Sequence, residues 1–264
     1  MFLINPYILQ ASGSYILDTY SGAVAAYSFR KLSSSYTGNL IRVRRSSDNA
    51  EQDIGLSGDS LDTSALTTFV GANDGFIVKM YDQSGNILDV SQSTASLQMK
   101  IVSSGTVVTN NGLTASLATG DSLVSASTIT NSTYSMVNVV NMTSVSSIYG
   151  RFGIYSGALA TFTSQADYTL RYDGDSDTGV LTPTTGNKIR YSERSNSAVY
   201  DYFNSVENIN NTSKSLPNIS GNVAIGYSSS YFTGYFHEFI IFDNSKLSVR
   251  TDLETNLNSY YNFY

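Results

Sequence analysis

The sequence predicts an all-β fold, a sandwich of two antiparallel sheets, on three observations. Only 14% of the 264 residues are charged, whereas Tyr and Gly each contribute 20, and this composition is typical of all-β extracellular or virion proteins. Short runs of β-branched and aromatic residues recur about every ten residues, with turn residues between them. Long helical periodicity is rare. One domain can hold the chain, because sandwiches often reach about 200–250 residues.

The N-terminal stretch is the first element to place. Residues 1–24 hold two short apolar pieces separated by Ala-Ser-Gly-Ser. They predict an arm ahead of a sandwich domain at residues 25–264. The arm either docks on a neighbouring subunit or virion component, or closes the sandwich, and both alternatives remain open.

Two helices are expected within the sandwich. Residues 63–70 follow Asp62 as N-cap and end at Gly71, with a Leu61–Leu66 contact across the first turn. This helix would cover one edge of the sandwich. The second, at residues 248–261, would begin at Ser248 as its cap and carry an apolar face.

Residues 81–86 are the stretch around which the chain is organised, and they follow an apolar strand predicted at residues 75–80. Asp82, Gln83, Gly85 and Asn86 are expected to form a turn at the end of that strand. An Asp side chain can accept hydrogen bonds from the nearby backbone, and Gly can take positive φ. This pattern predicts a structural motif in which Asp82 holds the turn.

An acidic segment follows a later strand and has two interpretations. Asp173, Asp175 and Asp177 alternate and are followed by Gly, as at the start of a calcium loop. The position of the closing Glu of an EF-hand holds Thr184, so an EF-hand is excluded. The segment is either a hairpin tip or a calcium site. No other cofactor is predicted, and the absence of Cys excludes a disulfide or thiolate site.

Three segments carry a family resemblance: residues 26–32 (Ala-Tyr-Ser-Phe-Arg-Lys-Leu), residues 41–55 (from Ile-Arg-Val-Arg-Arg to Asp-Ile-Gly) and residues 81–86 (Tyr-Asp-Gln-Ser-Gly-Asn). Together they resemble the catalytic domain of α-L-arabinofuranosidases, in the shortened form found in bacteriophage tail-fibre and other virion proteins. The resemblance implies a jelly-roll sandwich of the concanavalin-like or laminin-G-like kind. It also implies a possible glycosidase site, which needs two opposed carboxylates.

The positions implied by the resemblance argue against catalysis. The family's general acid lies just after an Ile-Gly step, but Ile225-Gly226 is followed here by Tyr-Ser-Ser-Ser-Tyr without a carboxylate. The resemblance implies that the family's nucleophile strand corresponds to residues 168–175, with Asp173 or Asp175 near the position of the nucleophile. Losing the acid costs on the order of 10²–10⁴ in rate. The sequence therefore predicts that the fold is retained and the hydrolysis is lost.

A binding surface is the remaining use of the domain. Tyr227, Ser228, Tyr231 and Phe232 lie in a Ser-rich loop between strands, where rings can stack on sugars and hydroxyls can bond them. The alternative is that the rings only cover the sandwich edge.

Three functions remain as hypotheses. The first is a bacteriophage virion surface protein (a fibre, receptor-binding or decoration element) that binds a host glycan. The alternatives are a glycoside hydrolase of the arabinofuranosidase type and a purely structural capsid or tail component. The expected partners are other virion proteins and further copies in a homo-oligomer, in the form of a trimer. The net charge of −6 argues against nucleic acid. No apolar run is long enough for membrane insertion, and no signal peptide is recognised, so assembly in the host cytoplasm and a place in the virion are expected.

Overall fold

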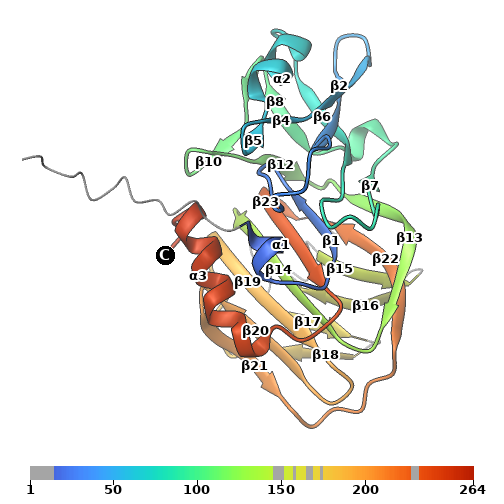
Figure 1. Ribbon diagram of the computed structural model, residues 1–264, viewed down its shortest axis with the longest axis vertical. Helices are drawn as coiled ribbons and strands as arrows, with labels where there is room; N and C mark the ends of the chain where they lie inside the picture. Colours follow the sequence, from blue (N-terminus) through green and yellow to red (C-terminus); the bar gives the residue numbers. More distant parts are fainter. Residues whose placement is uncertain (1–14, 145–151, 157–158, 165–168, 173–174, 227–231) are drawn as a thin grey trace, which may run out of the picture.

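The computed structural model describes residues 15–144, 152–156, 159–164, 169–172, 175–226 and 232–264. Most of its strands pair antiparallel in one continuous curled sheet that folds over to form two facing layers (Figure 1). This arrangement confirms the predicted β-sandwich.

The first layer runs in the order β21-β20-β19-β14-β23, and the long β23 then pairs with both β1 and β12. The strands of this layer are β1 (Ala23–Ser28), β12 (Ser116–Thr119), β14 (Tyr134–Met142), β19 (Gly186–Arg194), β20 (Val199–Phe203), β21 (Val206–Asn211) and β23 (Thr233–Phe242).

The second layer runs in the order β3-β2-β6-β7-β13-β22-β15-β16-β17-β18, with β8 beside β6 and β9 beside β8. Its strands are β2 (Ile41–Arg45), β3 (Glu51–Ile54), β6 (Gly75–Met80), β7 (Val90–Ser91), β8 (Lys100–Ser103), β9 (Thr106–Val107), β13 (Leu123–Asn131), β15 (Phe152–Ser156), β16 (Leu159–Ser164), β17 (Thr169–Tyr172), β18 (Asp175–Thr178) and β22 (Ile219–Ile225). A β8–β12 pairing joins the layers.

Two small hairpins complete the strands. They are β4 (Leu56–Ser57) with β5 (Ser60–Leu61), and β10 (Thr109–Asn110) with β11 (Leu113–Thr114). The helices are α1 (Ile16–Thr19), α2 (Thr63–Val70) and α3 (Arg250–Tyr261), with short 3-10 turns η1 (Ala95–Leu97) and η2 (Leu247–Val249).

The first layer is buried on both faces. In β14, Met136 points into the main core between the layers, whereas Val137 and Val139 belong to a second core on the opposite face. In β23, Phe239 and Ile240 divide in the same way. Because both faces are covered, these strands read as continuous apolar runs and do not alternate with polar residues.

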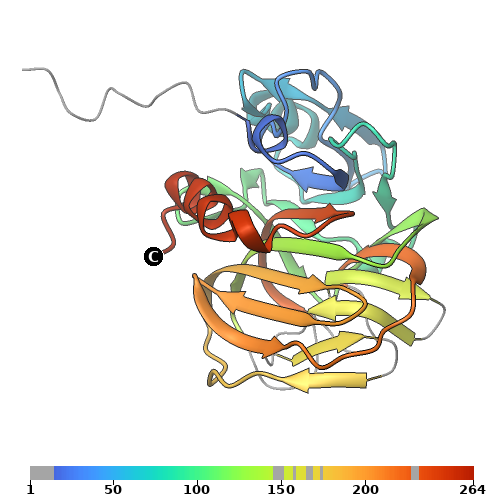
Figure 2. The same ribbon diagram turned by 60° about the horizontal axis from the view of Figure 1, so that its bottom comes forward.

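Helix α3 covers the second core. It contacts β19 and lies along the outer face of the first layer (Figures 1 and 2). Leu253 and Leu257 are fully buried there, and burial of each side chain stabilises the fold by roughly 1.5–3 kcal/mol. The predicted cap was wrong by one position: η2 places Ser248 inside a 3-10 turn, so the N-cap is Val249, without a side-chain hydrogen bond.

Helix α2 follows the prediction closely. The Asp62 carboxylate accepts a hydrogen bond from the Ala65 backbone N–H at 2.8 Å, and Gly71 ends the helix at φ +61°. Leu61 and Leu66 are both buried. The local signals that define helix ends were sufficient here, because they involve contacts within one turn.

The last ten residues of the predicted arm belong to the sandwich. Ile16 of α1 and Tyr20 are buried in the second core beside Leu253 and Leu257 of α3. Residues 15–24 therefore pack with the sandwich, in agreement with the alternative that this segment closes it. Residues 1–14 lie outside the described residues, so the docking alternative stays a prediction for them.

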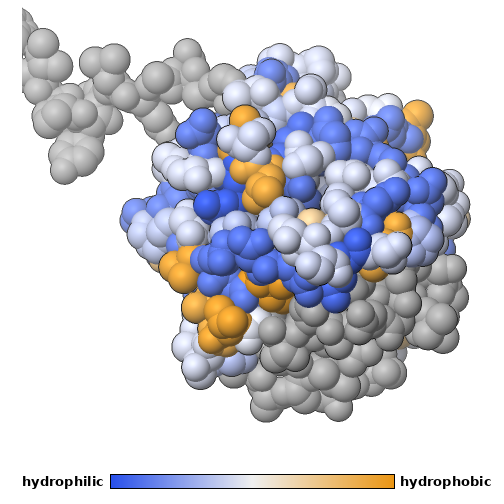
Figure 3. All heavy atoms as spheres, turned by 90° about the horizontal axis from the view of Figure 1, so that it is seen from below, coloured by the Kyte–Doolittle hydropathy of each residue, from blue (hydrophilic) through white to orange (hydrophobic). Residues whose placement is uncertain are grey.

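The surface is mostly polar. Figure 3 shows one face on which apolar residues form separate small patches among hydrophilic ones. Among the residues that the structure describes, the most exposed large apolar side chains are Ile87, Val180, Val206 and Tyr264. In the part of the chain that the structure describes, every helix is too short or too polar to cross a membrane.

Candidate functional site

The loop after β6 is built around one buried carboxylate. Asp82 Oδ1 accepts hydrogen bonds from the backbone N–H groups of Ala26 and Ser84, both at 2.9 Å. Its Oδ2 accepts from the Ser84 hydroxyl at 2.7 Å and the Leu88 N–H at 3.1 Å. Gly85 takes φ +91° within the turn. The predicted role of Asp82 as the residue that holds the turn is confirmed, and the Ala26 bond also ties the loop to β1.

Two amide side chains extend this attachment. Gln83 is buried, and its Oε1 accepts from the Leu32 N–H at 2.9 Å. Its Nε2 donates to the carbonyls of Arg30, at 2.9 Å, and Ser28, at 3.3 Å. The Asn86 amide donates to two carbonyls of β1. The motif therefore fixes both β1 and the segment that leaves it.

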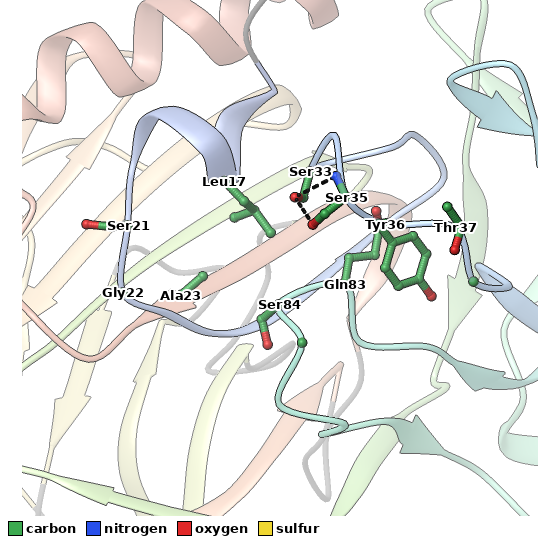
Figure 4. A pocket seen from close by; sticks show the side chains of 12 residues that line it. Leu17, Ser21, Gly22, Ala23, Ser33, Ser35, Tyr36, Thr37, Gln83 and Ser84 are labelled. Atoms are coloured by element: carbon green, nitrogen blue, oxygen red, sulfur yellow. Dashed lines mark hydrogen bonds between the residues drawn. The ribbon is translucent and has the colours of Figure 1, made fainter.

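A hollow of about 570 Å³ lies where this loop meets the segment after β1 (Figure 4). We call it the serine pocket. It is lined by Leu17, Ser21, Gly22, Ala23, Ser33, Ser35, Tyr36, Thr37, Gly38, Gln83, Ser84 and Gly85. Five of these residues carry a hydroxyl on Ser or Thr, one is aromatic, and none is charged.

The rim of the serine pocket is organised by hydrogen bonds. Ser33 Oγ lies 3.0 Å from Ser35 Oγ and donates to Asp18 Oδ1 at 2.9 Å. Asp18 stands outside the lining, and hydrogen bonds from Ser34 and Ser33 lower its pKa. It therefore stays ionised near neutral pH and orients the serine hydroxyls.

Tyr36 supplies the aromatic surface of the pocket. Its ring is half-buried, and its hydroxyl donates to the Asn39 carbonyl. Burial raises the pKa of Tyr36 to about 12, so the phenol is neutral at physiological pH. A ring held in this way offers an apolar face next to several hydroxyl groups.

Three buried carboxylates outside the serine pocket are held by internal donors. Asp201 forms a bidentate ion pair with Arg190, at 2.7 and 3.0 Å. Burial raises the pKa of Asp201. Glu238 pairs with Arg30 at 2.8 and 3.1 Å. Glu193 accepts from serine hydroxyls on two elements. These networks join strands and stabilise the sandwich.

The arginine-rich strand β2 holds two of its arginines in ion pairs with nearby carboxylates. Arg42 pairs with Asp53 at 2.7 Å, and Tyr81 donates to the same carboxylate. Arg45 pairs with Asp48 at 2.6 Å. Both arginines are therefore partnered within the protein.

The structure describes only some of the predicted site residues. Those that lie outside the described residues are Tyr227, Ser228, Tyr231 and Asp173. Phe232 is 1% exposed and packs edge-on against a core phenylalanine with ring centroids 5.2 Å apart. It therefore cannot stack on a surface sugar, because the strand that follows turns its ring into the core.

The remaining predicted acidic residues and the lone histidine are also placed. Asp175 and Asp177 belong to β18, which forms a hairpin with β17. No cluster of three or more metal-ligating side chains occurs among the described residues. His237 is buried, and its ring nitrogens lie 3.2 Å from the Thr114 carbonyl and 3.1 Å from Asn110 Oδ1.

The serine pocket itself was missed. Its largest contribution comes from residues 33–38, Ser-Ser-Ser-Tyr-Thr-Gly, which lie between two of the recognised motifs. That run combines hydroxyls with a ring, as does the loop at residues 227–232. Its proximity to Gln83 and Ser84 depends on long-range pairing.

Comparisons with known proteins agree with this architecture. The structure is similar to a GH54 α-L-arabinofuranosidase soaked with a cyclic sulfate inhibitor, with a TM-score of 0.68 and 16% identity over 89% of this chain and 62% of the other. It is also similar to an arabinofuranosidase complexed with arabinofuranosyl-α-1,2-xylobiose, with a TM-score of 0.66 and 17% identity over 92% and 64%. The chain thus spans less than two thirds of the length of these enzymes.

No curated protein matches the chain. The family description of α-L-arabinofuranosidase B, catalytic, matches residues 17–201. This match includes most of α1, together with β1, the arginine-rich strand β2, the Asp82 motif and both segments that form the serine pocket. The chain therefore belongs to the α-L-arabinofuranosidase B catalytic-domain family.

Proposed function

We propose that this protein binds glycans through the serine pocket and does not hydrolyse them. The observation that carries the proposal is the composition of the pocket lining: five Ser or Thr hydroxyls, one amide and one tyrosine ring, without a carboxylate. Hydroxyl and amide groups can bond sugar hydroxyls, and the ring can pack on a sugar C–H face. The volume of about 570 Å³ lies within the usual range of small-molecule sites.

Family membership supports a pentofuranosyl sugar as the ligand. The related structures include one complexed with an arabinofuranosyl-xylobiose. A neutral pocket suits a neutral sugar, because a buried charge opposite hydroxyls alone would lack a counter-charge.

Hydrolysis is the second candidate function, and family membership favours it. It requires two carboxylates across the sugar, about 5–5.5 Å apart for retention and about 6.5–9.5 Å apart for inversion. The segments that the resemblance implies for this chemistry, residues 168–175 and 227–231, include positions outside the described residues. The absence of a carboxylate after Gly226 in the sequence supports the non-catalytic proposal.

Binding can be tested by titrating methyl α-L-arabinofuranoside and following ligand signals by saturation-transfer NMR. Tyr36→Ala removes the ring and should weaken binding by about 2- to 10-fold, the loss expected for one aromatic contact. Tyr235→Ala is the matched control, because Tyr235 is also half-buried but lies on β23 outside the pocket. Equal affinity for both variants and the unmodified chain would rule out the serine pocket as the binding site.

We propose in addition that the domain is displayed on a virion as a homo-oligomer. The resemblance of residues 26–32, 41–55 and 81–86 to virion copies of the domain supports this. Several copies would raise the avidity of a shallow sugar site. Mass spectrometry of purified particles and light scattering of the isolated chain test the two parts of this proposal. A monomer that no particle contains would contradict both.

A further inference from the structure

A second hollow, of about 270 Å³, lies between the C-terminal end of α3, the β10–β11 hairpin and the start of α2. We call it the Arg30 pocket. The lining residues that matter for its chemistry are Phe29, Arg30, Thr63, Thr114, Tyr260 and Tyr261. The hairpin is fixed to α3 by a hydrogen bond from Asn111 Nδ2 to the Tyr261 carbonyl at 2.9 Å. The pocket is therefore formed by elements distant in sequence that are bonded to one another.

Arg30 presents free donors to this hollow. Its Nε and Nη2 bond Glu238 at 2.8 and 3.1 Å, whereas Nη1 has no hydrogen-bond partner among the described residues. The guanidinium carbon lies 4.4 Å from the centroid of the Tyr260 ring and 5.4 Å from that of Tyr261. The side chain of Arg30 is 12% exposed. The ion pair with Glu238 and the two tyrosine rings thus hold the guanidinium in place, while its Nη1 group remains available to donate a hydrogen bond to a ligand.

The charge balance decides which ligand fits. Glu238 is fully buried and accepts additional hydrogen bonds from Ser28, at 2.9 Å, and Tyr261, at 2.8 Å. The Arg30–Glu238 pair is neutral overall, and a ligand carboxylate would add a second negative charge beside Glu238. A neutral hydroxyl or ring oxygen can accept from Nη1 without that repulsion.

We propose that the Arg30 pocket binds one neutral sugar residue and is a second glycan site, separate from the serine pocket. The Tyr260 ring, which is half-buried, supplies a surface for the sugar. The Arg30 N–H groups and the hydroxyls of Thr63 and Thr114 supply polar contacts. The proposal does not depend on binding at the serine pocket, because the two pockets are lined by different residues.

The two sites share one support. Gln83 lines the serine pocket, and its Nε2 donates to the Arg30 carbonyl at 2.9 Å. The same buried amide therefore positions the backbone that carries Arg30 and the loop that forms the serine pocket. Two sites on one rigid domain would let a branched or extended glycan bind with higher avidity than either site alone.

The test uses the full chain labelled with 3-fluorotyrosine. Tyr260→Phe and Tyr36→Phe each remove one fluorine resonance, which assigns a reporter to each pocket. Titration with methyl β-D-xylopyranoside should shift the Tyr260 resonance saturably, and galacturonic acid should shift it less. Because Tyr36 reports on the serine pocket separately, failure of the proposed function there leaves this result unaffected.

A filling variant identifies the site. Thr63→Trp places an indole into the Arg30 pocket from an exposed position of α2 and should weaken the response of Tyr260 at least about tenfold. Thr68→Trp, on the same helix but outside this pocket, is the matched control and should leave the response unchanged. Circular dichroism checks that both variants fold. No saturable shift of Tyr260, an equal effect of both tryptophans, or a stronger response to galacturonic acid would overturn the proposal.

Discussion

Replacing Asp82 by Asn tests whether one carboxylate organises the loop after β6. The change keeps the size of the side chain, but one of two acceptor oxygens becomes an NH₂ group. Asp82 is 6% exposed and accepts hydrogen bonds from Ala26, Leu88 and, through two groups, Ser84. The Ser84 hydroxyl can rotate to accept from the new amide, whereas the Leu88 N–H can only donate. The buried backbone N–H of Leu88 then faces the NH₂ group of the new side chain and has no acceptor.

The cost follows from these contacts. An unsatisfied buried donor costs about 1–3 kcal/mol, and the two hydrogen bonds from Ala26 and Ser84 N–H to the remaining oxygen weaken because that acceptor is no longer charged. We expect the free energy of unfolding to fall by about 2–4 kcal/mol. A domain of ordinary stability, about 5–15 kcal/mol, would remain folded, so the loss can be measured.

Urea unfolding at neutral pH, followed by circular dichroism, gives the urea concentration at the midpoint and the slope with which the free energy of unfolding falls with urea concentration. Asp59→Asn is the control, because Asp59 is exposed and its carboxylate accepts a hydrogen bond only from the Tyr15 hydroxyl in the described structure. It should change the free energy of unfolding by less than about 0.5 kcal/mol. A similarly small change for Asp82→Asn, with an unchanged slope, would refute the view that this carboxylate holds the loop.

Three further predictions concern other parts of the sandwich. Arg190→Met leaves Asp201 buried without its cation and should lower the free energy of unfolding in urea by about 3–5 kcal/mol. Arg42→Met, at a more exposed ion pair, should lower it by less than about 1 kcal/mol. Equal losses would contradict the view that the buried pair contributes more to stability. Burial lowers the pKa of His237 to about 4, so the unfolded chain binds more protons between pH 6.5 and 4, and stability, complete above pH 6.5, should fall by up to about 3 kcal/mol across that window. His237→Gln should remove this part of the pH dependence, and an unchanged pH profile would refute it. Ile87 is 85% exposed at φ +58°, so Ile87→Asn should stabilise the protein by up to about 1 kcal/mol, and a loss of stability would show that its backbone is not strained.

The features predicted correctly from the sequence are those with local causes. The Asp62 cap, the stop at Gly71 and the Asp82 turn each depend on hydrogen bonds within a few residues. The strands of the first layer could be recognised because continuous apolar runs such as residues 239–242 remain buried on both faces.

The features that were missed depend on contacts between distant segments. The serine pocket joins the turn at Ser21, residues 33–38 and Ser84, and the hydrogen bonds of the loop after β6 to β1 and to the segment that follows β1 bring these together. Residues 15–24 looked like an arm because the core in which Ile16 is buried is built mainly from distant parts of the chain, α3 among them. The inward direction of Phe232 is likewise set by its contact with Phe152.

The most direct test of the central claim is one NMR experiment on the full chain with arabinofuranosyl-α-1,2-xylobiose. Saturation transfer reports binding, and the anomeric signals of the same sample report hydrolysis over time. We expect transfer to the sugar protons that Tyr36→Ala reduces, and no free arabinose above a sample without protein. Release of arabinose would show that the family's catalysis is retained, and an absence of transfer would show that this glycan is not a ligand; either result would contradict the account.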